Sequence, residues 1–323
     1  GSVVIDMDKT AKPHIILKNA AVTSPDGAAL RVAQADKVFI TLADGSVNTL
    51  ANGGSFADTE EGVDGAVFSK DDVTFNGTGA LTVSSPAGHG IVGKDDVVFT
   101  GGVYEITSAS HGIDANDDLI LTGGTLTVTG TVSNVGRLHV LDGTVEMRNS
   151  LSAMNYILKS MTNTAPTVRF DISADSSMSQ YVDAFGAGMP TIVLRTGAGR
   201  RLTSSNSLNC YGPQVRVDVG EGDTLEFKYL QQCAWRLPRA NTYLLKTGPG
   251  TFSATEAPTV PGSITDTFEG VLGGLRGGIT VREGTVRFGS DDFNPNCGLA
   301  NIYPGTVFPS NREGTLGHDT ATP

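Results

Sequence analysis

Three segments between residues 64 and 118 repeat one another, and this repeat constrains the fold more than any other feature of the chain. Each segment ends in a pair of acidic residues whose second member is Asp72, Asp96 or Asp118. These positions are 24 and then 22 residues apart, and a short apolar run and a turn with glycine follow each one. A period of about 20–25 residues built from short strands is typical of a parallel β-helix, in which each repeat forms one coil.

We therefore expect an all-β parallel solenoid with irregular C-terminal coils and loops. Equivalent side chains of successive coils stack about 4.8 Å apart in such a fold. The pattern predicts two inward stacks, Val67 with Ile91 and Ile113, and Phe75 with Phe99 and Leu121. Residues 1–130 are expected to form regular coils, residues 131–290 a less regular solenoid, and residues 291–323 capping loops or a tail. Residues 149–164 are expected to hold a short helix or a loop.

The same stacking brings carboxylates together. The sequence predicts one column of Asp71, Asp95 and Asp117, and beside it a second column of Asp72, Asp96 and Asp118. Two unit charges about 5 Å apart repel by roughly 3 kcal/mol at an effective dielectric near 20. Bound cations would relieve this repulsion, and oxygen ligands on turns suit Ca²⁺. The alternative is a solvated polar corner, with Lys70 and Lys94 neutralising part of the charge.

Further candidate ligands lie within the same repeats. Asp64 and Asp114 are additional candidates for the metal. His89 and His111 occupy one register, and we expect a stacked ladder there rather than a zinc site, since no cysteine or third histidine lies close to them in sequence.

The repeat also carries a resemblance. The stretches 38–50, 64–83 and 89–96, with their recurring Lys-Asp-Asp corner, resemble the bacterial carbohydrate-binding domain-containing family of calcium-binding parallel β-helices. The resemblance covers about residues 3–130. It implies a right-handed β-helix at the bacterial cell surface that binds Ca²⁺ and acidic (pectin-like) or cellulosic polysaccharides without established catalysis. It places Ca²⁺ near the six aspartates of the two columns. The third copy departs from the pattern, because Asn116 replaces the lysine.

A second resemblance lies near the end of the chain. Residues 245–252 and 278–288 are similar to the autotransporter-associated β-strand repeat of large secreted bacterial proteins, over about residues 244–288. This implies a continuing β-helix in a secreted or surface-displayed passenger. Both resemblances therefore imply an extracellular or cell-surface location.

The composition of the chain limits the classes of partner that it can be expected to bind. The net charge of −11 argues against nucleic acid and anionic membranes, which bind through lysine and arginine patches. An acidic polysaccharide would need bridging cations for the same reason. No apolar run approaches about 18 residues, so we expect no membrane-spanning segment.

Candidate sugar-binding residues are Trp235 and Tyr229, together with Lys70 and Lys94. Aromatic rings on a β face can stack on sugars, but they also fill space between coils, which is the expected role of Phe227. The expected function is non-catalytic, Ca²⁺-dependent polysaccharide binding. Two alternatives stay open: a structural passenger or self-associating fibre subunit, and a Ca²⁺-dependent polysaccharide lyase with Lys70 or Lys94 as its base.

Overall fold

The computed structural model describes residues 1–57, 62–133, 137–148, 155–161, 163–232, 243–255, 278–288 and 301–302. This described part of the chain is built from β-strands connected by turns and loops. It contains no helix, and therefore none that could cross a membrane. The chain divides into two compact units, unit 1 (Gly1–Tyr156) and unit 2 (Ile157–Pro323).

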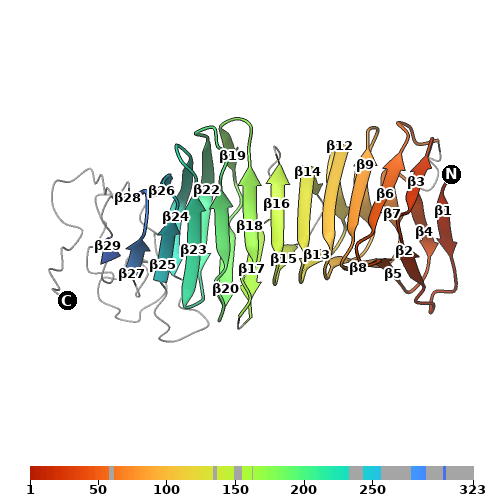
Figure 1. The fold of residues 1–323 in the computed structure, drawn as a ribbon, viewed down its shortest axis with the longest axis horizontal. Coiled ribbons are helices and arrows are strands. Elements are labelled where there is room, and N and C mark those ends of the chain that lie inside the picture. Colours follow the sequence, from red (N-terminus) through yellow and green to blue (C-terminus); the bar gives the residue numbers. More distant parts are fainter. Residues whose placement is uncertain are drawn as a thin grey trace, which may run out of the picture. The chain divides into compact units, whose positions relative to one another are not determined.

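Unit 1 consists of short strands whose described pairings are parallel (Figure 1). The strands are β1 (Val3–Asp6), β2 (His14–Leu17), β3 (Ala21–Ser24), β4 (Leu30–Gln34), β5 (Lys37–Leu42), β6 (Val47–Asn52), β7 (Gly65–Ser69), β8 (Asp72–Gly77), β9 (Ala80–Ser85), β10 (His89–Gly93), β11 (Val97–Phe99), β12 (Val103–Ala115), β13 (Asp118–Leu121), β14 (Thr125–Ser133), β15 (Arg137–Val140) and β16 (Thr144–Arg148).

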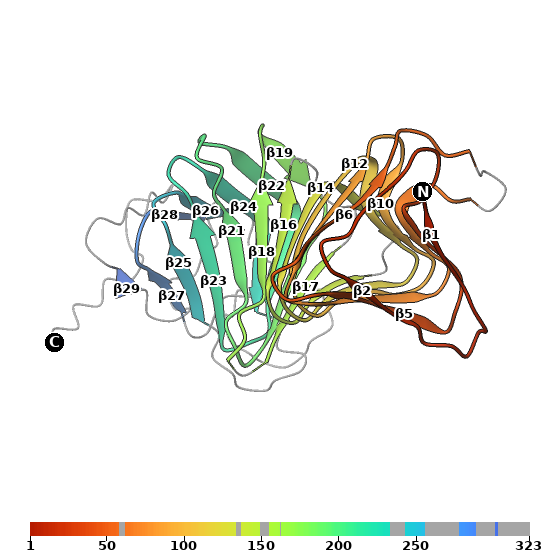
Figure 2. The same cartoon turned by 45° about the vertical axis from the view of Figure 1, so that its right-hand side comes forward.

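Three strand segments make one coil of unit 1, so the coils have three walls. In one coil β7 lies in the first wall, β8 in the second and β9 in the third, and the next coil repeats this with β10, β11 and the first half of β12. Figure 2 shows β1, β5 and β6 on three different sides. The second wall runs β2-β5-β8-β11-β13-β15. The parallel solenoid expected from the repeat is confirmed.

The core lies inside the walls, and both predicted stacks are present. Ile91 pairs with Val67 on one side and Ile113 on the other, and all three side chains are buried. Phe99 pairs in the same way with Phe75 and Leu121. The rings of Phe75 and Phe99 stack with centroids 4.9 Å apart. In-register pairing therefore turns the sequence period into continuous apolar columns.

Glycines form the corner between the second and third walls. Gly102, Gly124 and Gly143 have φ of 90°, 86° and 80°, in the left-handed region that disfavours residues with a Cβ. A Cβ on Gly124 would also lie 2.4 Å from the carbonyl oxygen of Gly102, one coil away. This corner thus requires glycine for its backbone angle and for its close approach to the neighbouring coil.

We expect Gly124→Ala to destabilise unit 1 strongly. Gly45→Ala is the matched control, since Gly45 also has positive φ but a Cβ there would meet no atom within 4 Å. The control should lose roughly 1 kcal/mol of unfolding free energy, and Gly124→Ala roughly 3 kcal/mol or more, because it adds a clash to the strain. Urea unfolding followed by circular dichroism measures both, and equal losses would contradict the close-packing argument.

Unit 2 follows the same parallel pattern, as its described pairings show. The later strands are β17 (Tyr156–Ser160), β18 (Thr167–Asp171), β19 (Ser176–Met178), β20 (Val182–Gly186), β21 (Thr191–Leu194), β22 (Arg201–Cys210), β23 (Gln214–Val219), β24 (Thr224–Gln232), β25 (Tyr243–Thr247), β26 (Thr251–Ala254), β27 (Gly278–Val281), β28 (Thr285–Phe288) and β29 (Asn301–Ile302). The first half of β22 pairs with β19 and its second half with β20.

The helix or loop expected over residues 149–164 is wrong for Tyr156–Ser160, which form strand β17. Tyr156, Leu158 and Ser160 are buried and alternate with more exposed residues, so the segment has the period of two that a half-buried strand requires. The tail expected over residues 291–323 lies outside the described residues, apart from β29.

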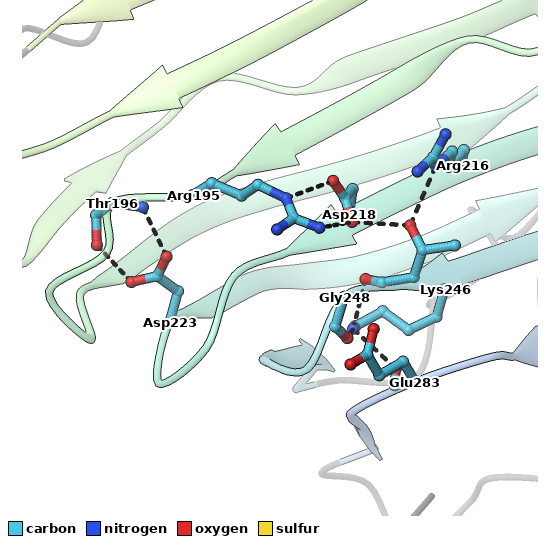
Figure 3. A network of polar contacts seen from close by, with 9 residues as sticks. Arg195, Thr196, Arg216, Asp218, Asp223, Lys246, Gly248 and Glu283 are labelled. Carbon is cyan, nitrogen blue, oxygen red and sulfur yellow. Dashed lines mark hydrogen bonds and ion pairs between the residues drawn. The ribbon is translucent and has the colours of Figure 1, made fainter.

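A polar network joins consecutive coils of unit 2 (Figure 3). The guanidinium of Arg195 donates two hydrogen bonds to the carboxylate of Asp218, at 2.7 and 2.9 Å. The Thr247 hydroxyl donates to the same carboxylate at 2.9 Å. Burial alone would raise the pKa of Asp218, but these hydrogen bonds lower it below its ordinary 3.8. None of these residues was among the candidates predicted from the sequence.

Lys246 is buried in the same region. Its Nζ donates to the carbonyl oxygens of Thr247, Gly248 and Glu283, at 2.8, 2.6 and 3.2 Å. Burial lowers its pKa from 10.5 to about 8, against the opposing influence of Asp218 and Glu283. At neutral pH the ammonium therefore holds two turns of unit 2 together.

The lowered pKa of Lys246 predicts in which direction the unfolding free energy changes with pH. The unfolded chain binds this proton up to about pH 10.5 and the folded chain only to about pH 8, so folding becomes more favourable as pH rises between these values. The unfolding free energy of the wild type, minus that of Lys246→Met, should rise across this window by about 2–3 kcal/mol. Denaturant titrations at several pH values measure it, and a flat difference would contradict a lowered pKa.

Candidate metal and carbohydrate site

The acidic corner of unit 1 lies where the second wall begins. Asp96 donates its backbone N–H to the carboxylate of Asp72 at 3.2 Å, and Asp118 donates its own N–H to Asp96 at 2.9 Å. The carboxylates of Asp72 and Asp96 are thus each held by the backbone amide of the next coil. The predicted column of these three residues is present as a hydrogen-bonded ladder.

Cationic residues occupy both ends of this ladder. Lys37 pairs in register with Asp72, and its Nζ lies 3.1 Å from the Asp72 carboxylate. Arg137 pairs in register with Asp118, and the ring of His139 lies 3.6 Å from that carboxylate. These three residues lie outside the three aligned segments of the repeat. Extending the repeat by one coil in each direction would have found Lys37 and Arg137.

Three carboxylates of the corner come close enough together to bind one cation. Oxygens of Asp95, Asp96 and Asp117 lie within 4.8 Å of one another. Ca²⁺ binds oxygen at about 2.3–2.6 Å, so two ligands of one ion lie at most about 5.2 Å apart. Desolvation and the nearby carboxylates of Asp72 and Asp117 raise the pKa of Asp95 above its ordinary 3.8. This arrangement fits Ca²⁺, which would relieve the repulsion.

The other predicted ligands lie elsewhere. The carboxylate of Asp71 accepts a hydrogen bond from the backbone of Ala35 in the preceding coil. Asp64 lies 3.4 Å from the His89 ring, whose stacked contact with His111 at 4.9 Å matches the expected ladder. Asp114 is buried in β12, paired with Val92 in the first wall.

The two lysines of the repeat lie in different surroundings. The Nζ of Lys94 lies over the ring of Phe68, 5.7 Å from its centroid. Phe68 belongs to a buried cluster with Val92, so Lys94 is directed to the first wall. Lys70 is exposed. Lys37, from the preceding coil, contacts the Asp72 carboxylate of the ladder.

The outer face of the second wall continues from the acidic ladder as two further rows. One row, two residues along each strand, is mainly apolar and half-buried: Phe39, Thr74, Val98, Ile120 and His139. The exposed ring of His14 stacks on Phe39 with centroids 4.5 Å apart. The next row consists of Thr41, Asn76, Thr100 and Thr122. Carboxylates, an apolar strip and hydroxyl groups therefore lie side by side on one sheet face.

The aromatic candidates belong to unit 2. Trp235 lies outside the described residues. Tyr229 is half-buried in β24, with the Nζ of Lys228 5.1 Å from its ring centroid. Phe227 is buried in the core, as expected.

Two comparisons with known proteins find a likeness, and one of them covers the acidic corner. A family model described as carbohydrate-binding domain-containing protein matches residues 1–149. A protein of that description from Acetivibrio thermocellus is 32% identical over 105 residues, which are 32% of this chain and 37% of the relative. The chain thus spans little more than a third of that relative's length. No solved structure matches the chain. Both likenesses are to proteins described as carbohydrate-binding domain-containing, and the family model covers the strands of the second wall.

Proposed function

We propose that unit 1 binds polysaccharide on the outer face of its second wall, with Ca²⁺ held by Asp95, Asp96 and Asp117. The observation that carries the proposal is the three-row face itself. The cation would attract carboxylates of an acidic glycan to a chain that otherwise repels them, since the net charge is −11. The apolar row offers contact to the C–H face of sugar rings, and the threonine row offers hydrogen bonds.

We make two further proposals, one on the cellular location of the protein and one on the handedness of its coils. Polysaccharide of this kind lies outside the cell, so we propose an exported protein displayed extracellularly or at the bacterial surface, consistent with the resemblance of the later strands to secreted passengers. We propose right-handed coils, because crossover connections between parallel strands are right-handed in about 98% of cases. The role is binding without catalysis.

The substitution Asp95→Asn tests the metal site, because its effect on stability should differ in sign between EDTA and Ca²⁺. In EDTA, Asp95→Asn should raise the unfolding free energy by a few tenths of a kcal/mol, because it removes like-charge repulsion at an exposed site. In Ca²⁺ at 100 times its Kd, the wild type should gain about 2.7 kcal/mol and the variant much less. Thermal unfolding with Asp26→Asn as an exposed control measures this. Equal Ca²⁺ gains in both proteins would contradict the metal site.

The ligand is tested with polygalacturonate. Affinity electrophoresis should show binding by the wild type in Ca²⁺ and its loss in EDTA, with Asp95→Asn at least about tenfold weaker in Ca²⁺, a change of about 1.4 kcal/mol. Binding that is equal with and without Ca²⁺ would argue against cation bridging. Release of unsaturated sugar during the incubation would instead identify a lyase.

A further inference from the structure

A groove of about 560 Å³ lies on unit 2, far in sequence from the acidic corner. It is formed by β19, β22 and β24 with residues that follow β19 and β26. The lining is rich in hydroxyl groups, among them those of Ser177 and Thr203, and includes two charged side chains, Glu226 and Lys228. A volume of this size is within the range of small-molecule sites, roughly 300–1,000 Å³.

The polar groups of the groove are arranged in register. Ser177 pairs with Thr203, and Thr203 pairs with Glu226, on three successive coils. Parallel strands lie about 4.8 Å apart, so hydrogen-bonding groups recur at that interval along the groove. This interval is close to the length of one sugar residue in an extended glycan. Each coil of the protein can therefore contact one sugar residue of the glycan.

The charged groups of the groove are held in place. Arg201 donates to the carboxylate of Glu226 at 2.8 Å, and the Glu226 side chain is 15% exposed. Lys228 lies against the ring of Tyr229, with its Nζ 5.1 Å from the centroid. This contact helps to hold the Lys228 side chain in place in the lining of the groove.

We propose that this groove binds a neutral glycan, in an extended conformation and without a metal ion. Hydroxyl, carboxylate and ammonium groups match the hydroxyls of a sugar as donors and acceptors. The two charged groups of the lining, Glu226 and Lys228, are of opposite sign, so the lining offers no net positive charge to select uronic acids. In the part of unit 2 that the structure describes, no three acidic, histidine or cysteine side chains cluster closely enough to hold a bridging cation. The proposal extends polysaccharide binding to a second unit but does not depend on the Ca²⁺ site.

The experiment measures binding of cellohexaose, xylohexaose, mannohexaose and polygalacturonate by calorimetry in EDTA. The double variant Thr203→Val with Lys228→Met removes two polar groups of the groove while keeping their shape. Thr23→Val with Lys18→Met makes the same changes at exposed positions of unit 1 and serves as the control. Thermal unfolding of each variant confirms that it folds.

We expect at least one neutral hexasaccharide to bind the wild type, the control and Asp95→Asn equally, and the groove variant at least tenfold more weakly. Binding of polygalacturonate alone, no binding of any neutral glycan, or unchanged binding by the folded groove variant would each overturn the proposal. The Ca²⁺-dependent binding of polygalacturonate reports on unit 1 separately, so either site can fail without the other.

Discussion

In-register hydrogen bonding between successive parallel coils is the constraint on which the rest of unit 1 depends. It places equivalent positions of successive coils one above another, about 4.8 Å apart, so a repeated residue type stacks on its own kind. For Val67, Ile91 and Ile113 this produces a dry column inside the walls. For aspartates it produces a line of like charges. The apolar core and the acidic corner are thus two outcomes of one geometry, applied to inward and outward positions.

The line of charge is tolerated because neighbouring groups compensate it. Backbone amides of the next coil donate to Asp72 and Asp96, and Lys37 closes one end of the ladder. What stays poorly compensated is the adjoining cluster with Asp95, whose pKa is raised. The corner therefore combines a structural ladder with a cluster suited to a cation, and Asp96 belongs to both.

The repeat predicted most of unit 1, because a fixed period sets the register and hence which residues stack. It did not predict where individual carboxylates point. Asp71 faces the amide of Ala35, a contact set by the irregular spacing of the coil before the repeat. Lys94 could not be assigned to Phe68 from spacing alone, since the two side chains meet on the first wall rather than at the corner. In unit 2 the strand spacing varies, so the groove, the Arg195–Asp218 pair and β17 left no periodic signal.

The ladder from Asp72 to Asp118 has a modular construction. Each carboxylate takes its hydrogen bond from the coil that follows, so every coil completes the one before it and leaves its own acceptor for the next. Inserting one whole coil of matching sequence would lengthen the face by a single strand spacing and leave existing contacts unchanged. Duplication of a coil is therefore a route by which such a protein could acquire a longer binding face. It could then bind a longer polymer without substitution of any residue that it already has.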